Sequence, residues 1–204
     1  MKKLVLALFC SLLLTLPLAA EEWNLDPAHS KVRFTAEARF LSADGIFRKF
    51  QVKADVNEAE LEKSAIDMVV DVASIDTNVG KRDDHLRSDA FFDVAHYPTA
   101  HIAVGQIRKL STGNYEGDGQ ITIRGVTKPL RLPARILLME GGRLRFRGTV
   151  EINRMDFGVS YNGAMNKIED MVSITYELNL VKPRPPGQGP GQAPAPPAAK
   201  PPQN

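Results

Sequence analysis

The pattern that most constrains this chain is a strict alternation of apolar and polar side chains. In residues 31–40, every second side chain is apolar and the ones between are polar or charged. Successive side chains of a β-strand point to opposite faces, so this pattern is typical of a strand with one buried face. Together with residues 31–40, seven further runs of this kind occur, at residues 50–56, 66–72, 99–109, 120–124, 130–139, 143–152 and 172–180. We therefore expect an all-β fold of about eight strands.

The segments between these runs carry turn residues. Glycine beside Asp or Asn indicates turns at residues 43–45 and 112–114, and a glycine pair indicates another at 140–142. The strand–helix alternation of a parallel sheet is missing, so we expect antiparallel strands. Long antiparallel strands with one apolar face fit a sandwich or a barrel, and a closed barrel leaves no exposed edge.

An eight-stranded barrel encloses an interior that is either filled by side chains or able to hold one small ligand. Small residues on the inward faces favour a hollow interior, whereas large neighbours such as Phe146 favour a filled one. The sequence leaves both open. If the interior is hollow, the candidate wall residues are Phe34, Ala36, Ala38, Phe50, Val52, Met68, Val70 and Ile102.

One short segment, residues 81–88, has the pattern of a surface helix. Asp83 and Arg87 stand four positions apart, a spacing that brings opposite charges together on a helix. Arg82, His85 and Arg87 are candidate contacts for the head group of a ligand at a barrel mouth, because Arg suits anionic groups. The alternative is a set of surface ion pairs with Asp83 and Asp84.

The two ends of the chain differ in composition from its middle. Residues 1–20 combine a positive start, an apolar run and a small residue before Glu21, which is the pattern of a secretory signal peptide. Residues 182–204 contain nine prolines and three glycines, so we expect a disordered, extended tail. Residues 21–181 then form one domain.

Composition and motifs exclude several function classes. Lys and Arg total 26 against 24 Asp and Glu, a formal charge of +2 that lacks the basic excess of a nucleic-acid-binding protein. The single cysteine, Cys10, rules out a four-cysteine zinc site. Motifs for zinc proteases, phosphate-binding loops and nucleophile elbows are missing. We expect no metal, no cofactor and no catalytic residue. The acid and base that a lipid-acting enzyme would need, Asp71 and His101, fall on outward faces.

Several segments, taken in order, resemble the YceI-like family of secreted, lipocalin-like polyisoprenoid-binding barrels. They span nearly all of residues 23–180. The matching segments are residues 23–34, 45–47 with Phe50, 74–77, 82–88, 91–93, 97–98, 119–129 and 154–158. Two features depart from the family pattern: Ala38 stands where many members carry a His on the first strand, and the proline-rich tail lies outside the family pattern.

The resemblance implies an eight-stranded lipocalin-like barrel that holds a long apolar ligand, such as an isoprenoid quinone or a fatty-acid amide. It also implies export to the periplasm or beyond, and no enzymatic activity. We expect transport, storage or sequestration of such a lipid, with transient contact with a membrane surface. The alternative is a filled barrel that binds a protein or envelope component through its surface or its proline-rich tail. The sequence does not predict an oligomeric state.

Overall fold

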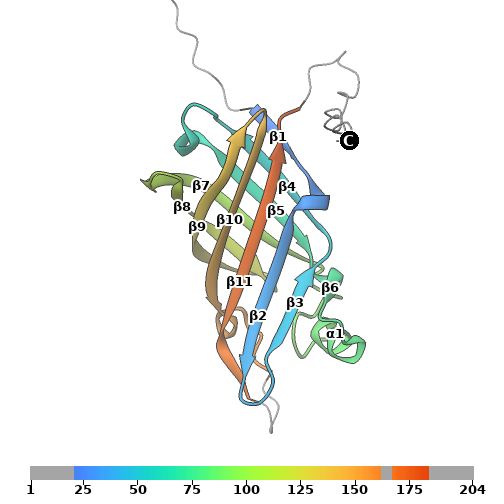
Figure 1. Cartoon of the computed structure of the whole chain (residues 1–204). Helices are drawn as coiled ribbons and strands as arrows, with labels where there is room; N and C mark the ends of the chain where they lie inside the picture. Colours follow the sequence, from blue (N-terminus) through green and yellow to red (C-terminus); the bar gives the residue numbers. More distant parts are fainter. Residues whose placement is uncertain (1–20, 162–166, 184–204) are drawn as a thin grey trace, which may run out of the picture.

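The computed structural model describes residues 21–161 and 167–183. Their strands form one antiparallel sheet, with one α-helix, α1 (Gly80–Arg87), beside it (Figure 1). The strands are β1 (Glu21–Leu25), β2 (Lys31–Ala38), β3 (Ala43–Phe47), β4 (Phe50–Val56), β5 (Ala65–Asp71), β6 (Ile75–Asp76), β7 (Thr99–Ser111), β8 (Asn114–Ile123), β9 (Val126–Glu140), β10 (Arg143–Asn153) and β11 (Ile168–Val181). Short 3-10 turns cover Pro27–His29, Leu61–Lys63, Val72–Ser74 and Arg154–Phe157.

The sheet closes on itself because β1 pairs with both β4 and β11. Three long strands of the barrel are each interrupted and so count as two: β1 with β2, β3 with β4, and β5 with β6. We call each of these pairs, and each uninterrupted strand, one wall of the barrel. The pairing of β1 with β4 and of β4 with β5 continues beyond the interruptions as the pairing of β2 with β3 and of β3 with β6. Counted as walls, the strands make an eight-stranded antiparallel barrel with one short helix. The fold predicted from the alternation is therefore confirmed.

The two ends of the barrel are packed differently. At one end the side chains of Trp23, Ala54 and Leu180 are almost fully buried and fill the interior. At the other end a second apolar cluster joins Phe91 and Phe157 to the strand residues around Ile121. Helix α1 and the β2–β3 hairpin lie at this second end (Figure 1).

The β2–β3 hairpin differs from the prediction. Residues 43–45 belong to β3, and the turn lies at residues 39–42. Gly45 is needed inside the strand, because a Cβ atom there would overlap the ring of Phe34. Phe40, which continues the inward alternation of β2, is 66% exposed because β2 ends at Ala38 and the chain turns outside the barrel wall.

The predicted signal peptide lies outside the described residues, as does the predicted tail from residue 184 onward. The first residue of that tail, Lys182, is bound to the packed end of the barrel. Its Nζ atom lies 2.8 Å from a carboxylate oxygen of Glu21, and its backbone N–H donates to the carbonyl of Gly142. Within the described part of the chain, none of the helices has the length and apolar character needed to cross a membrane.

Candidate functional site

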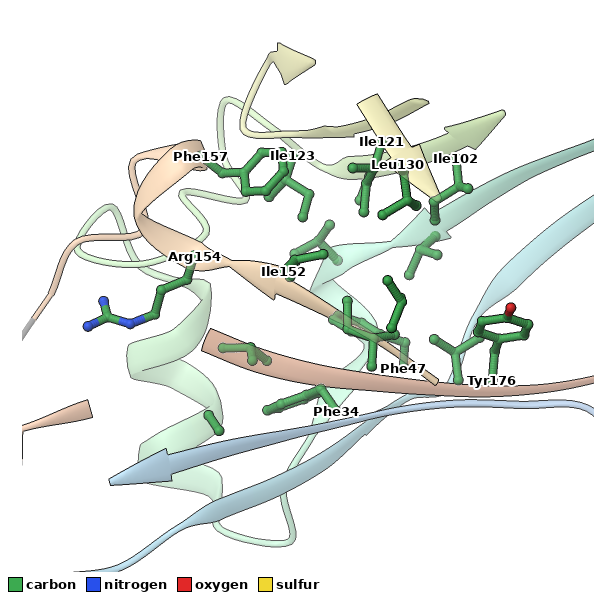
Figure 2. A pocket seen from close by; sticks show the side chains of 18 of the residues that line it. Phe34, Phe47, Ile102, Ile121, Ile123, Leu130, Ile152, Arg154, Phe157 and Tyr176 are labelled. Atoms are coloured by element: carbon green, nitrogen blue, oxygen red, sulfur yellow. The ribbon is translucent and has the colours of Figure 1, made fainter. Parts of the chain in front are cut away.

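The interior of the barrel is hollow between its two apolar clusters. The cavity has a volume of about 480 Å³ and is lined by side chains from β2, β3, β5, β7–β11 and α1. Figure 2 shows Ile102, Ile121 and Leu130 facing Phe34 and Phe47 across the space between opposite walls. Most of the lining is aliphatic or aromatic, and a volume of this size is typical of small-molecule sites.

The structure places most of the predicted wall residues at this cavity. Those that line it are Phe34, Ala36, Ala38, Met68, Val70 and Ile102. Phe50 and Val52 do not. Val52 is buried in the apolar cluster that fills the packed end, beyond the cavity. Phe50 begins β4 at the break after β3, and it lines a separate groove on the side of the barrel.

The cavity reaches the surface at the end that carries α1. Leu41 is 75% exposed and also lines the cavity, so the interior opens between the β2–β3 hairpin, α1 and residues 159–161. Arg82 and His85 of α1 line this opening, which we call the mouth. The His85 ring makes edge contacts with the rings of Tyr161 and Phe91, at centroid distances of 4.6 and 5.0 Å.

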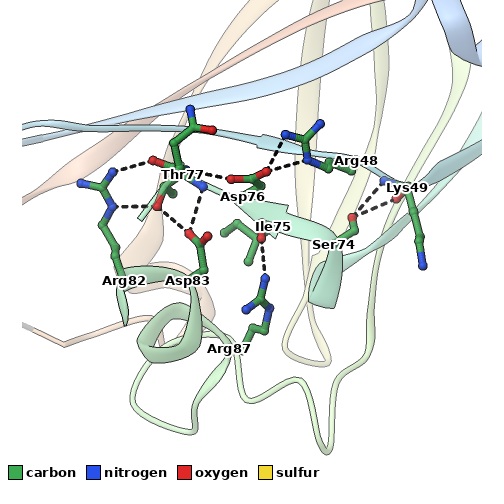
Figure 3. Close-up of polar contacts among 10 residues, drawn as sticks. Arg48, Lys49, Ser74, Ile75, Asp76, Thr77, Arg82, Asp83 and Arg87 are labelled. Carbon is green, nitrogen blue, oxygen red and sulfur yellow. Dashed lines mark hydrogen bonds and ion pairs between the residues drawn. The ribbon is translucent and has the colours of Figure 1, made fainter. Parts of the chain in front are cut away.

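Helix α1 is held at the mouth by a buried contact with the chain before it (Figure 3). The Asp83 carboxylate accepts hydrogen bonds from the backbone N–H of Thr77, at 2.9 Å, and from its hydroxyl, at 2.5 Å. The Arg82 Nε–H donates to the same hydroxyl, at 2.8 Å. These contacts fix Arg82 beside the cavity, with its guanidinium bound on one side to the loop that follows β6.

The predicted pairing of Asp83 with Arg87 is wrong. Asp83 turns inward to Thr77, while the Arg87 guanidinium donates to the carbonyls of Ala73 and Ile75 and pairs with Asp84. Arg87 does not line the cavity, so of the three candidate head-group contacts only Arg82 and His85 lie at the mouth. Arg87 instead ties α1 to the carbonyls beside β6.

Comparison with known proteins places this barrel in a family. The family model of the YceI-like domain matches residues 23–180. The chain belongs to the YceI-like family. A UPF0312 protein of Vibrio cholerae is 29% identical over 179 residues, which cover 83% of this chain and 95% of the relative. A UPF0312 protein of Shewanella denitrificans is 30% identical over 169 residues, 78% of this chain and 88% of the relative.

Solved structures share the barrel. BcnA of Burkholderia cenocepacia superposes with a TM-score of 0.71 at 26% identity, covering 76% of this chain and 99% of BcnA. A polyisoprenoid binding domain from Saccharophagus degradans, implicated in plant cell wall breakdown, superposes with a TM-score of 0.63 at 15% identity, covering 79% of this chain and 98% of that domain. The similarity to the second structure concerns the fold.

A buried arginine of the family-matching segment 154–158, to which the sequence assigned no role, holds one side of the mouth in this YceI-like barrel. Arg154 is 5% exposed and begins the turn after β10. Its guanidinium donates to the carbonyls of Val159 at 2.6 Å, Glu169 and Ile168 at 2.9 Å, and Tyr161 at 3.1 Å. These acceptors follow Arg154 by 5 to 15 residues, and only the folded structure shows that their carbonyls converge on one side chain.

Tyr176, 6% exposed, is a second buried polar side chain of the cavity wall. Its hydroxyl donates to the backbone carbonyl of Pro133, and burial raises the pKa of the phenol well above its usual value.

Other wall residues that the prediction omitted follow the same alternation of apolar and polar side chains as those it named, so the sequence contained the pattern that could have identified them. They include Ile121, Ile123, Leu130, Leu132, Val150, Ile152 and Ile174.

The described residues contain no group of three or more His, Cys, Asp and Glu side chains placed to hold a metal ion. The two titratable residues that an enzymatic reading would use lie away from the cavity. Asp71 accepts from the backbone N–H of Ala73, and His101 contacts Asp67 at 2.7 Å, half exposed. Neither residue is part of the cavity lining.

Proposed function

We propose that this YceI-like protein binds a long-chain apolar lipid, an isoprenoid of the quinone kind or a related lipid, inside its barrel. The observation that carries the proposal is the apolar cavity of about 480 Å³, which is closed at one end by Trp23 and Leu180 and opens at the other. The fold shared with a domain described as polyisoprenoid binding supports the same ligand class.

The driving force for such binding is the removal of apolar surface from water. Each Å² of apolar surface that leaves water contributes about 25 cal/mol, so a long prenyl or acyl chain gains affinity without any charged contact. The wall meets this need, since Phe34, Met68 and Ile102 present only carbon or sulfur atoms to the interior. The small side chains of Ala36 and Ala38 leave space beside them.

The distribution of polar groups orients the ligand. The apolar chain lies toward the packed end, and a polar head lies at the mouth, where Arg82 and His85 supply donors. Arg82 suits a head group with carbonyl, carboxylate or phosphate oxygens. Arg87 contributes indirectly, because it anchors α1 and so positions these two side chains.

The proposal is one of binding, for transport, storage or sequestration. Asp71 and His101 face away from the ligand space, so the barrel gives a bound lipid no acid or base at those positions. The pattern of residues 1–20 supports export, to the periplasm or beyond the cell, where such a lipid would need protection from water.

A displacement titration tests the ligand class. The purified protein is saturated with N-phenyl-1-naphthylamine, an uncharged apolar fluorophore whose emission rises in an apolar site. Prenols and ubiquinones of increasing chain length are then added as competitors. We expect displacement that strengthens with chain length until the cavity is filled. A probe that gains no emission, or is displaced equally well by short and long prenols, contradicts the proposal.

A further inference from the structure

The two adjacent apolar residues at the tip of the β2–β3 hairpin stand out on the surface of the described chain. Phe40 is 66% exposed and Leu41 is 75% exposed. Leu110, at 60%, is the next most exposed of the large apolar side chains, and the others are 47% or less. A pair of large apolar side chains at a protruding turn is a feature of interaction sites rather than of scattered surface residues.

The tip is continuous with the cavity. Leu41, Ala38 and Ala43 line the cavity from the hairpin, while the Leu41 side chain also faces solvent. An apolar ligand that enters at the mouth therefore meets an unbroken apolar path from the outer tip to the interior. In Figure 1 this hairpin forms the lower end of the barrel, beyond the other strands of the wall.

The base of the tip carries positive charge. The Arg39 guanidinium lies over the Phe40 ring, 5.2 Å from its centroid. The backbone N–H of Arg39 donates to the carbonyl of Lys167, which brings a second cation to the base of the hairpin. The acidic residues of β2 and β3, Glu37 and Asp44, lie farther from the turn, and Asp44 accepts a hydrogen bond from Thr35. Glu169 and Asp170 of β11 also lie farther from the turn than Lys167, and Asp170 pairs with Arg154.

We propose that residues 39–42 form a docking tip that inserts into an anionic lipid surface and places the cavity mouth against the bilayer. Phe40 and Leu41 enter the boundary of the acyl chains, and Arg39 and Lys167 lie at the level of the phosphate groups, where each cation adds attraction. The inference rests on the proposed function, because it supplies the route by which a lipid passes between the bilayer and the cavity without crossing water.

The test is flotation with vesicles of phosphatidylethanolamine and phosphatidylglycerol. We compare the wild type with Leu41→Ser and with Leu110→Ser, a matched control at the far end of β7 from the mouth. Loss of one buried leucine contact lowers the partition coefficient between vesicle and water about tenfold. The partition coefficient of Leu41→Ser should therefore be about tenfold below that of the wild type. Leu110→Ser should float as wild type. Arg39→Gln should lose about fivefold on these vesicles and little on vesicles of phosphatidylcholine alone.

Three results overturn the docking tip: a wild type that does not float, a Leu41→Ser variant that floats as well as wild type, or an equal loss in Leu110→Ser. If sedimentation velocity without vesicles shows a dimer that Leu41→Ser abolishes, the tip contacts a second copy of the chain and not a membrane, which also overturns the proposal. The fluorophore titration in solution separates the two proposals. Phe40→Ser changes the same tip at a residue that does not line the cavity. If Phe40→Ser binds the probe normally but floats poorly, both proposals stand. If wild type floats but binds no probe, docking stands and the lipid-binding proposal fails.

Discussion

The hydroxyl of Tyr176 on β11 crosses over the neighbouring strand β10 and donates a hydrogen bond to the backbone carbonyl of Pro133 on β9. The residue beneath it on β10 is Gly148, which pairs in register with Tyr176. A Cβ atom at position 148 would overlap both the Pro133 carbonyl oxygen and the Tyr176 hydroxyl. Three adjacent strands of the cavity wall are thus joined at a point that only glycine allows.

Gly148→Ala is therefore expected to destabilise the barrel. The overlap is with backbone and with a buried ring, neither of which can move freely, so we expect a loss of about 2–3 kcal/mol in the free energy of unfolding. Urea unfolding followed by the fluorescence of Trp23, the single tryptophan, measures it. Gly105→Ala is the matched control, because a Cβ atom at position 105 meets only open space. Equal stabilities of the two variants would contradict the packing described here.

Tyr176 also predicts a loss of stability in alkali. Its pKa is raised in the folded state above the ordinary value of 10.0, so its contribution is fully present below pH 10 and declines as the pH rises above it, when the unfolded chain loses the proton first. Tyr176→Phe should cost about 1 kcal/mol at neutral pH, since the Pro133 carbonyl loses its donor. Its unfolding free energy should then fall less than that of the wild type above pH 10. Parallel pH profiles for the two proteins would contradict this role.

The extent to which sequence predicts this fold follows from where the alternation is interrupted. The alternation of apolar and polar side chains predicted the barrel walls because each wall has one apolar face along most of its length. It failed at Phe40, where the alternation continues but the wall has ended. For Phe50 the alternation predicted the contact with the core but not the position, because this side chain lies beside the break between β3 and β4, where a lateral groove and not the cavity is found. Such breaks depend on pairing between distant strands.

The mouth was harder to predict than the walls. Arg82 and His85 were singled out from the character of their side chains, whereas the burial of Asp83 against Thr77 depends on how α1 packs. Arg154 lies in residues 154–158, one of the segments that resemble the family, but the sequence did not indicate its role. Its four carbonyl acceptors come from residues 159–169, and a buried arginine satisfied by backbone looks in the sequence like any surface charge.

Arg154→Lys tests the role of that arginine at the mouth. An ammonium group cannot reach four carbonyls that diverge around a planar guanidinium, so buried acceptors lose their donors and we expect a cost of about 3 kcal/mol. Hydrogen exchange should also show faster opening of the backbone around Val159. The exposed Arg143, changed to Lys in the same way, should leave both measurements as in wild type. A similar effect of the two changes would contradict this role.

Ala36→Phe tests whether the hollow interior is the binding space. The new ring projects into the cavity, so uptake of N-phenyl-1-naphthylamine should fall about tenfold or more while the barrel stays folded. Ala103→Phe is the control, because Ala103 lies on the opposite face of β7 from the lining residues Ile102 and Val104. Unchanged probe uptake in Ala36→Phe would place the binding elsewhere.

The most direct measurement is organic extraction of the purified, exported protein followed by mass spectrometry of the extract. The Ala36→Phe variant and an unrelated exported protein serve as controls. We predict a near-stoichiometric prenyl lipid or long-chain lipid in the wild-type extract, strongly reduced in Ala36→Phe and missing from the unrelated protein. A folded wild type that yields no lipid, even from lipid-rich cells, would contradict the proposal that this barrel is a lipid-binding protein.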